Sequence, residues 1–208
     1  MLYSLVKRAL DITISLLAFI IFSPFALLCS LAIWLEDWGS VIYSQERVGK
    51  DRTPFKIYKF RSMVKNADAL LFSNSELYEK MRSGAHKMDD DPRVTRIGRF
   101  LRKYSIDEFP QFLNVLRGEM SFVGPRAYRP DELEKYEREN PGVRSALATI
   151  LSIKPGITGL WQVSGRSQLS FGERIRLEEK YARSDSLLLD FYIILKTPLA
   201  VAQAKGAA

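Results

Sequence analysis

The chain of 208 residues is long enough for one or two domains, and its 47% apolar and 26% charged residues are typical of a folded protein. Lysine and arginine outnumber aspartate and glutamate by 31 to 24, which gives a net charge of +7. The single cysteine, Cys29, excludes an intrachain disulfide, and the single histidine, His86, excludes paired-histidine metal sites. Any chemistry therefore rests on carboxylates, hydroxyls, amines and guanidinium groups, or on a hard cation such as Mg²⁺.

A long apolar segment lies near the N-terminus. Lys7, Arg8 and Asp11 precede residues 12–35, which carry no charge, and at about 1.5 Å per residue this run can cross a bilayer core. A buried core helix and a signal peptide are the alternatives. The run has neither the polar face of a core helix nor the small residues of a cleavage site. We therefore expect a membrane segment.

The flanks of this segment indicate its orientation. Lys7 and Arg8 precede it and a basic remainder follows it, and short basic flanks favour the cytoplasmic side. Ser23-Pro24 lies in the middle, where proline removes a backbone donor and kinks a helix. A re-entrant helix hairpin over residues 1–36 satisfies both flanks, whereas a kinked spanning helix is the alternative. Arg8 is expected to reach lipid phosphate.

The remainder, residues 37–208, is expected to form one cytoplasmic-face catalytic domain, and the whole chain an α+β protein that is mostly helical with a small β-sheet. Short strands are expected at 41–43 and 55–60. The expected helices cover residues 64–81, 93–104, 105–116, 130–140, 171–183 and 187–204. The basic amphipathic helix 93–104 and the apolar helix 187–204 are candidates for lying at the membrane interface.

The strongest local motif is Ser105-Ile106-Asp107-Glu108. A serine followed three residues later by a glutamate predicts a capping box, with both acidic residues in the first turn of a helix. Such residues can simply stabilise the helix dipole. In the functional interpretation, the helix start attracts phosphate and keeps Asp107 ionised as a nucleophile, while Glu108 holds Mg²⁺.

Basic residues supply candidate phosphate ligands. Strand alternation puts Lys59 and Arg61 on one face, which is either a solvated surface or a phosphate-facing cluster. Arg126 follows a glycine-flanked strand, where it can form either a bidentate phosphate contact or a surface salt bridge.

The acidic run Asp89-Asp90-Asp91 contains the D-x-D spacing of metal-dependent glycosyltransferases, although such a run in a polar loop is usually just solvated. Two further classes of function are alternatives. A non-catalytic membrane adaptor would explain the positive charge by attraction to anionic lipid. A nucleic-acid binder fits poorly, because the apolar segment has no role there and no reader motif is present.

Three long motifs carry a resemblance to a known family. They are FKIYKFRSM at residues 55–63, DDPRVTRIGRFLRKYSIDEFPQFLNVLRGEMSFVGPR at 90–126 and KPGITGLWQVSGRS at 154–167. In this order they closely resemble the bacterial sugar transferase family, the monotopic phosphoglycosyl transferases that are also called undecaprenyl-phosphate sugar phosphotransferases. The resemblance runs from Lys7 to about Pro198.

The resemblance implies an activity and a location. Family members transfer a sugar-1-phosphate from a UDP-sugar to polyprenyl (undecaprenyl) phosphate and release UMP, an early membrane step of polysaccharide assembly such as exopolysaccharide or O-antigen. They lie monotopically on the cytoplasmic face of the bacterial inner membrane, and Ser23-Pro24 matches their re-entrant helix. The motif GLWQVSGRS is more similar to galactose- or glucose-phosphate transferases. Larger members carry further membrane helices, so this chain corresponds to the catalytic core.

The resemblance also implies residue roles. Asp107 attacks the β-phosphorus and forms a covalent phospho-sugar intermediate, and Glu108 helps to coordinate Mg²⁺. Lys59 and Arg126 hold the phosphates, and Arg166 contacts the nucleotide. The sequence leaves the sugar open, as well as whether the chain forms a homodimer.

Overall fold

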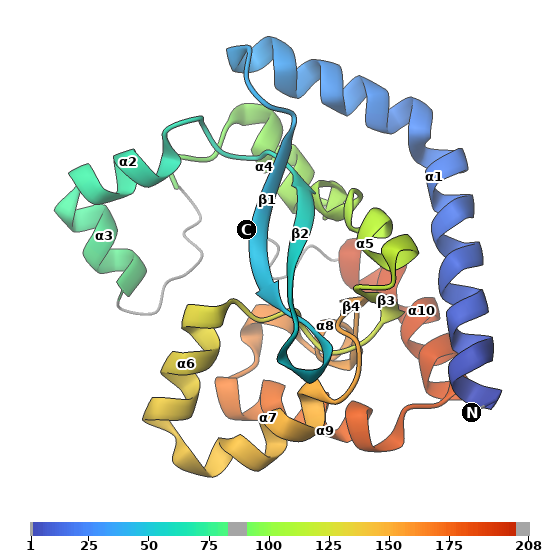
Figure 1. The fold of residues 1–208 in the computed structure, drawn as a ribbon. Helices are drawn as coiled ribbons and strands as arrows, with labels where there is room; N and C mark the ends of the chain where they lie inside the picture. The colour runs from blue at the N-terminus through green and yellow to red at the C-terminus, as the bar shows by residue number, and fades with distance from the viewer. Residues whose placement is uncertain (1, 83–90, 203–208) are drawn as a thin grey trace.

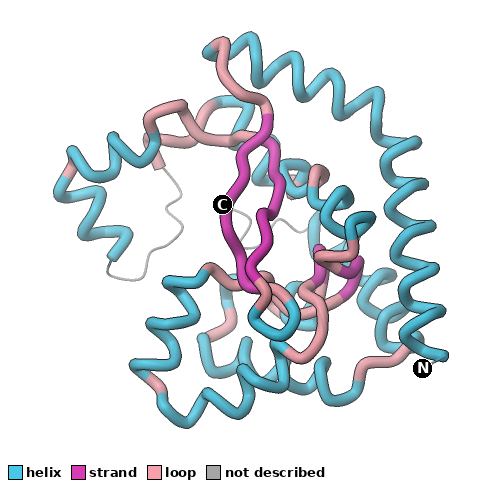
Figure 2. Tube along the Cα trace, in the orientation of Figure 1, coloured by secondary structure: helices cyan, strands magenta, loops and turns pink. Residues whose placement is uncertain are grey.

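The computed structural model describes residues 2–82 and 91–202, which form mostly helices and two two-stranded sheets (Figures 1 and 2). The helices are α1 (Leu2–Asp37), α2 (Ala67–Ser73), α3 (Ser75–Arg82), α4 (Arg96–Lys103), α5 (Gln111–Arg117), α6 (Pro130–Glu139), α7 (Arg144–Leu151), α8 (Leu160–Val163), α9 (Phe171–Ser184) and α10 (Leu187–Ala202). The strands are β1 (Ile42–Val48), β2 (Pro54–Phe60), β3 (Ser121–Val123) and β4 (Gly156–Thr158). The predicted α+β class, mostly helical, is confirmed.

Helix α1 is continuous but bends in its middle, so that it borders the molecule on two sides (Figure 1). Pro24 lies inside it and has no N–H to give to the carbonyl of Ile20 one turn earlier. The hydroxyl of Ser23 donates to that carbonyl instead, at 3.1 Å. Pro24 thus removes one backbone hydrogen bond, and the Ser23 hydroxyl replaces it. In place of the expected hairpin the structure has one bent helix.

The N-terminal half of α1 is bound to the body by polar contacts. The buried carboxylate of Asp11 accepts hydrogen bonds from the Ser121 hydroxyl at 2.8 Å and from the Phe122 amide at 2.9 Å. Lys7 forms a 2.7 Å salt bridge with Asp190 of α10. These bonds join the start of the chain to β3 and to its last helix.

The C-terminal half of α1 is bound mainly by apolar contacts. Cys29 and Ile33 are buried in one cluster with Leu101 of α4. Just after this cluster, Asp37 forms an ion pair with Arg61, which follows β2. Both halves of the helix therefore belong to the core of the same body.

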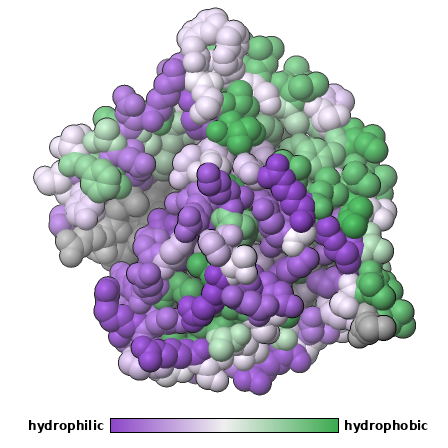
Figure 3. Space-filling view, in the orientation of Figure 1, coloured by the Kyte–Doolittle hydropathy of each residue, from purple (hydrophilic) through white to green (hydrophobic). Residues whose placement is uncertain are grey.

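Much of the outer surface of α1 is nevertheless apolar and exposed. It is the one helix among the described residues that is long and apolar enough to cross a membrane, and only 17% of its most apolar window is buried. In the space-filling view, hydrophobic residues gather along α1 (Figure 3). Apolar side chains that are at least half exposed on α1 and α10 include Leu17, Ile20, Ile21, Leu27, Leu28, Leu188 and Leu195. A surface of this kind indicates association with a membrane.

The hairpin β1–β2 runs through the middle of the molecule (Figure 1), with Ile42 opposite Phe60 and Val48 opposite Pro54. Strand β2 forms where the sequence predicts it, whereas β1 extends beyond the predicted 41–43 because it pairs along the whole length of β2. The largest cluster of buried side chains lies below the hairpin, between β1, α6, α7 and α9.

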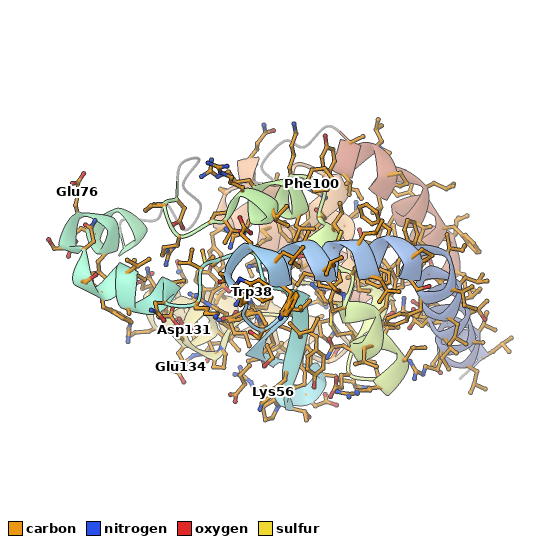
Figure 4. All side chains as sticks on the ribbon, turned by 90° about the horizontal axis from the view of Figure 1, so that it is seen from above. Trp38, Lys56, Glu76, Phe100, Asp131 and Glu134 are labelled. Atoms are coloured by element: carbon orange, nitrogen blue, oxygen red, sulfur yellow. The ribbon has the colours of Figure 1, made fainter. Side chains whose placement is uncertain are left out.

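Three predicted helices differ from the structure. In place of the predicted helix 105–116 there is a 3₁₀ turn at Ile106–Glu108, followed by α5. The predicted helix 64–81 is divided into α2 and α3 at Asn74, whose backbone is extended. Helix α4 begins at Arg96 instead of 93, because the Thr95 hydroxyl caps it by accepting from the Gly98 amide at 2.9 Å. Seen from above, α3 reaches away from the body with Glu76 at its outer side (Figure 4).

Candidate active site

Asp107 and Glu108 lie on a 3₁₀ turn between α4 and α5. The predicted capping box at Ser105 is wrong: this residue has a left-handed backbone with φ of 56° and its side chain caps nothing. An N-cap requires an extended backbone, which Ser170 has when it forms a capping box with Glu173 at the start of α9. The two carboxylates are therefore held by a tight turn and not by the start of a regular helix.

Strand β2 brings Lys59 to these carboxylates. Its Nζ atom donates to Glu108 Oε1 at 2.8 Å and lies 3.7 Å from Asp107 Oδ2. The strand is fixed here by Asn114 of α5, whose side-chain oxygen accepts from the Tyr58 amide at 3.1 Å. Lys59, a predicted phosphate ligand, thus lies beside Asp107, the predicted nucleophile.

Burial raises the pKa of Asp107; the charge of Lys59 opposes this shift and that of Glu108 adds to it. The expectation that a helix start lowers the pKa of Asp107 is therefore wrong. For Lys59, burial lowers the pKa, but the two carboxylates outweigh it and raise the pKa above its ordinary value. Lys59 thus stays cationic and favours the ionised form of Asp107.

A pocket of about 50 Å³ adjoins Lys59 and Glu108. Its lining comprises Arg47, Ile57, Lys59, Glu108, Gln111, Met120, Arg126, Ala127, Gly156, Ile157, Trp161 and Gln162. Gly156 belongs to the parallel pair β3–β4, and a Cβ atom there would lie 2.1 Å from the Gly124 amide. This close approach brings the segment after β3, with Arg126, next to the segment after β4, with Trp161.

Two arginines join Lys59 in this lining. Each has an Nε atom that is buried and has no hydrogen-bond partner among the described residues. Arg47 gives one of its other donors to the Ala127 carbonyl, at 3.1 Å. Burial, followed by the charge of Arg126, lowers the pKa of Arg47 to about 10. Three crowded cations, two of which have an unused donor, favour the binding of an anion.

The other predicted basic residues are not among those that line the pocket. Arg166 follows α8 on a left-handed backbone with φ of 53°; burial lowers its pKa, and the charge of Glu108 opposes the shift. Arg61 is not brought to the pocket. Because β2 ends at Phe60, the Arg61 side chain turns toward the end of α1 and pairs with Asp37.

Arg8 has partners within the protein. Its guanidinium donates to the carbonyls of Val115 at 2.6 Å and Leu116 at 2.9 Å, the last turn of α5. The Val115 carbonyl also accepts from the Gly118 amide at 2.9 Å, and the two further bonds from Arg8 join α1 to the end of α5. A contact of Arg8 with lipid phosphate stays a prediction.

Of the acidic run, Asp89 and Asp90 lie outside the described residues. Asp91 is buried and forms a salt bridge of 2.6 Å with Arg93, which lowers the pKa of the carboxyl against the opposing effect of burial. This carboxylate is occupied by an internal partner, which does not favour the metal-dependent glycosyltransferase alternative.

Sequence reasoning missed Arg47, Arg102, Trp161 and Gln162 as site residues. Arg102 lies on α4; burial lowers its pKa, and Asp107 is the largest opposing charge. None of the four forms a local motif with the acidic pair. Arg47 lies 60 residues before Asp107 and meets the site only because β1 pairs with β2, so no local signal could have identified it.

The chain is similar to known proteins along nearly its whole length. The family model described as "Bacterial sugar transferase" matches residues 2–204. The chain is 43% identical over 205 residues to "Exopolysaccharide production protein ExoY" of Sinorhizobium fredii, covering 97% of this chain and 87% of the relative. It is 39% identical to "Undecaprenyl-phosphate galactose phosphotransferase" of Salmonella typhimurium, covering 97% of this chain and 41% of the relative.

A third relative, 36% identical over 99% of this chain and 46% of its own length, is "UDP-N-acetylgalactosamine-undecaprenyl-phosphate N-acetylgalactosaminephosphotransferase" of Aeromonas hydrophila. The chain thus spans most of the length of ExoY and less than half of the other two. A match over nearly every residue settles the family. The chain belongs to the bacterial sugar transferase family and is therefore an enzyme.

Proposed function

We propose that the protein transfers a sugar-1-phosphate from a UDP-sugar, with a hexose such as galactose or glucose, to polyprenyl phosphate and releases UMP. One observation carries this proposal: an anion pocket with three cations adjoins Glu108 of the carboxylate pair, and the residue after Glu108 packs against the long apolar helix α1. Phe109, next to Glu108, has its ring centroid 5.2 Å from that of Phe19 in the middle of α1. A phosphate on a lipid within the membrane would enter at this level.

The donor fits the pocket through its diphosphate. Lys59, Arg47 and Arg126 line a volume of about 50 Å³, which is too small for a whole nucleotide sugar but large enough for a phosphate group. The buried Nε atoms of both arginines need acceptors, and diphosphate oxygens supply them. Names of relatives that include UDP-N-acetylgalactosamine and UDP-galactose support a UDP-sugar as the donor.

Asp107 is proposed as the nucleophile. A carboxylate oxygen of Asp107 attacks the β-phosphorus, and the bond from this phosphorus to the bridging oxygen breaks, so that UMP leaves with that oxygen. An oxygen of polyprenyl phosphate then attacks the same phosphorus. The bond to Asp107 breaks, which restores the carboxylate and gives the polyprenyl diphosphate sugar. Lys59 and the two arginines stabilise the negative charge of both transition states.

Mg²⁺ is proposed as the cofactor. Asp107 and Glu108 provide adjacent carboxylates, and Mg²⁺ in proteins is commonly held by one or two carboxylates together with substrate phosphates. Within residues 2–82 and 91–202 no cluster of three or more acidic, histidine or cysteine side chains is arranged for a metal. Glu108 would be the main protein ligand of such an ion, beside Asp107, and the substrate and water would have to supply the rest. When bound, Mg²⁺ neutralises charge on the diphosphate.

We also propose a monotopic location on the cytoplasmic face of the bacterial inner membrane. The two ends of α1 contact one body, through Lys7 and Asp190 at one end and Asp37 and Arg61 at the other. A helix whose ends stay on one side of the bilayer must enter and leave through the same leaflet. The exposed aromatic side chain of Phe100 on α4 and the apolar face of α10 would lie at the interface. In Figure 4, Phe100 points away from the side where Lys56 lies.

The nucleotide product tests this function. Purified protein in lipid nanodiscs is given a UDP-hexose, Mg²⁺ and polyprenyl phosphate, and the products are separated by chromatography. We expect UMP. In addition, labelled UMP should exchange into UDP-sugar without the lipid acceptor, and Asp107→Asn should abolish both reactions, with Asp185→Asn as the matched control. Release of UDP, or UMP release by Asp107→Asn at the wild-type rate, would overturn the proposal.

A further inference from the structure

One polar atom of the pocket does not suit an anion. The side-chain oxygen of Gln162, at the end of α8, is buried and has no hydrogen-bond partner among the described residues. Its side-chain nitrogen donates to the Ile157 carbonyl at 2.8 Å. Because a carbonyl can only accept, this bond fixes the amide with its nitrogen toward Ile157 and its oxygen unpaired. The unpaired atom is an acceptor, and it needs a donor.

The neighbouring Trp161 carries the complementary group. Its indole N–H is also buried and unpaired within the described part of the chain. The ring is fixed by two guanidinium groups, since the Cζ atoms of Arg126 and Arg174 lie 5.6 and 5.8 Å from its centroid. A fixed N–H donor and a fixed oxygen acceptor therefore occupy consecutive positions in the same lining.

Phosphate does not satisfy both groups. The diphosphate of a nucleotide sugar offers only acceptors at neutral pH, which suit Arg47 and Arg126 but not the oxygen of Gln162. A hydroxyl is a donor and an acceptor at once, so one hydroxyl can give its proton to Gln162 and accept from Trp161. Leaving both groups unpaired on substrate binding would cost free energy, so a substrate that carries this hydroxyl is favoured.

We propose that Gln162 and Trp161 form a hydroxyl-recognition pair that makes Gln162 a specificity-determining residue for the donor. This inference rests on the proposed function. The pocket is small and shared with Lys59 and Arg126, so the groups within reach are those attached directly to the diphosphate. They are the hexose on the β-phosphate and the ribose on the α-phosphate, whose shared chemistry is the hydroxyl.

The test removes the side chain and the hydroxyl separately and together. The donor is whichever the wild type prefers among UDP-galactose, UDP-glucose and their N-acetylated forms, together with analogues of it that each lack one hexose or ribose hydroxyl. For one analogue, wild-type kcat/KM should fall about tenfold, the worth of one hydrogen bond to a neutral group. Gln162→Met should lower kcat/KM for the full donor by a similar factor. In this variant kcat/KM should be the same for that analogue as for the full donor.

The analogue that loses discrimination identifies the source of the hydroxyl. If it lacks a hexose hydroxyl, inhibition by UMP should be unchanged in Gln162→Met; if it lacks a ribose hydroxyl, inhibition by UMP should weaken about tenfold. Trp161→Phe, which keeps the ring but removes the N–H, should blunt discrimination of the same analogue. Gln162→Glu, which keeps an acceptor, should retain part of it.

A structural role predicts a different pattern. If Gln162 only supports Ile157, Gln162→Met should lower kcat/KM by the same factor for every donor and analogue. This result would overturn the inference. Gln168→Met, the same change at an exposed glutamine six residues later, is the matched control and should behave as wild type. Failure of the wild type to release UMP from any UDP-hexose would instead overturn the proposed function and with it this inference.

Discussion

Lys59 donates a 2.8 Å hydrogen bond to Glu108, and this bond, rather than one to Asp107, is its shorter contact with the acidic pair. The charge of Lys59 still reaches Asp107, whose nearer oxygen lies 3.7 Å away. Glu108 thus holds a cation beside Asp107 while leaving the Asp107 oxygens available. Burial raises the pKa of Asp107, and this neighbouring charge opposes that effect by favouring the ionised carboxylate.

Replacing Lys59 by glutamine should shift the pH dependence of the reaction. Asp107 attacks as the carboxylate, so activity is lost as pH falls through its pKa. Lys59 lowers that pKa, and without it burial and Glu108 should raise the pKa further. We expect the acidic limb of kcat/KM to move to higher pH in Lys59→Gln, measured by UMP release. Lys56→Gln, on the exposed side of the same strand, should leave the limb in place.

Arg47 should matter for binding more than for stability. Arg47→Gln removes a donor from the anion pocket, and we expect kcat/KM for the UDP-sugar to fall about 10- to 100-fold, the worth of one charge-assisted hydrogen bond. The same change relieves repulsion between Arg47 and Arg126, which offsets the lost bond to Ala127. Thermal unfolding should therefore change little. A large loss of stability with unchanged kcat/KM would show Arg47 to be structural, and Arg52→Gln, at an exposed arginine, serves as control.

Glu178 should make the protein less stable at high pH. The Glu178 carboxylate is fully buried and accepts hydrogen bonds from the Arg126 amide and the Tyr128 hydroxyl. Burial raises its pKa from 4.5 to about 7. A raised folded-state pKa means that the contribution of Glu178 to stability is fully present below pH 4.5 and is lost as pH rises through about 7. The loss from this group should be roughly 3 kcal/mol.

Glu178→Gln, which mimics the protonated carboxyl, should remove this contribution. Thermal unfolding in detergent at about pH 5 and about pH 8 measures it, since the wild-type melting temperature should drop more than that of the variant. Equal drops in both proteins would mean that Glu178 stays in one protonation state throughout. Glu179→Gln, at the next position of α9, is the matched control.

Pro24 should determine the course of α1. Pro24→Ala supplies an N–H that can bond the Ile20 carbonyl, which frees Ser23 and lets the helix straighten. We expect cysteines placed at Leu2 and at Trp38, in a Cys29→Ser background, to be protected from an impermeant label in intact cells. In Pro24→Ala the cysteine at Leu2 should become reactive. Protection of both ends in the variant would show that proline does not set the topology.

The sequence predicted elements whose signals are local. Strand β2 and helix α9 appeared where expected, because alternation and a capping box act over a few residues. The capping box predicted at Ser105 was wrong, because the sequence matches the motif although the backbone of Ser105 is left-handed. Arg61 and Lys59 share a strand face by pattern, yet the end of the strand separates their side chains. Such differences depend on neighbours that are distant in the chain.

The same limit applies to the site. Lys59, Asp107, Glu108 and Arg126 could be proposed from motifs, and the fold brings them together. Gln162 could not, because its role depends on which of its two polar atoms the Ile157 carbonyl occupies. A sequence gives the amide but not its orientation.

The bonds of Asp11 to Ser121 and Phe122 have a consequence for how firmly α1 is held. The long apolar helix also supplies the partner of a buried hydroxyl and of the backbone amide next to it. Moving the start of α1 away from the body would leave both groups without this acceptor, which costs free energy. The N-terminal part of α1 therefore behaves as a fixed part of the interior, whatever surrounds its exposed apolar side.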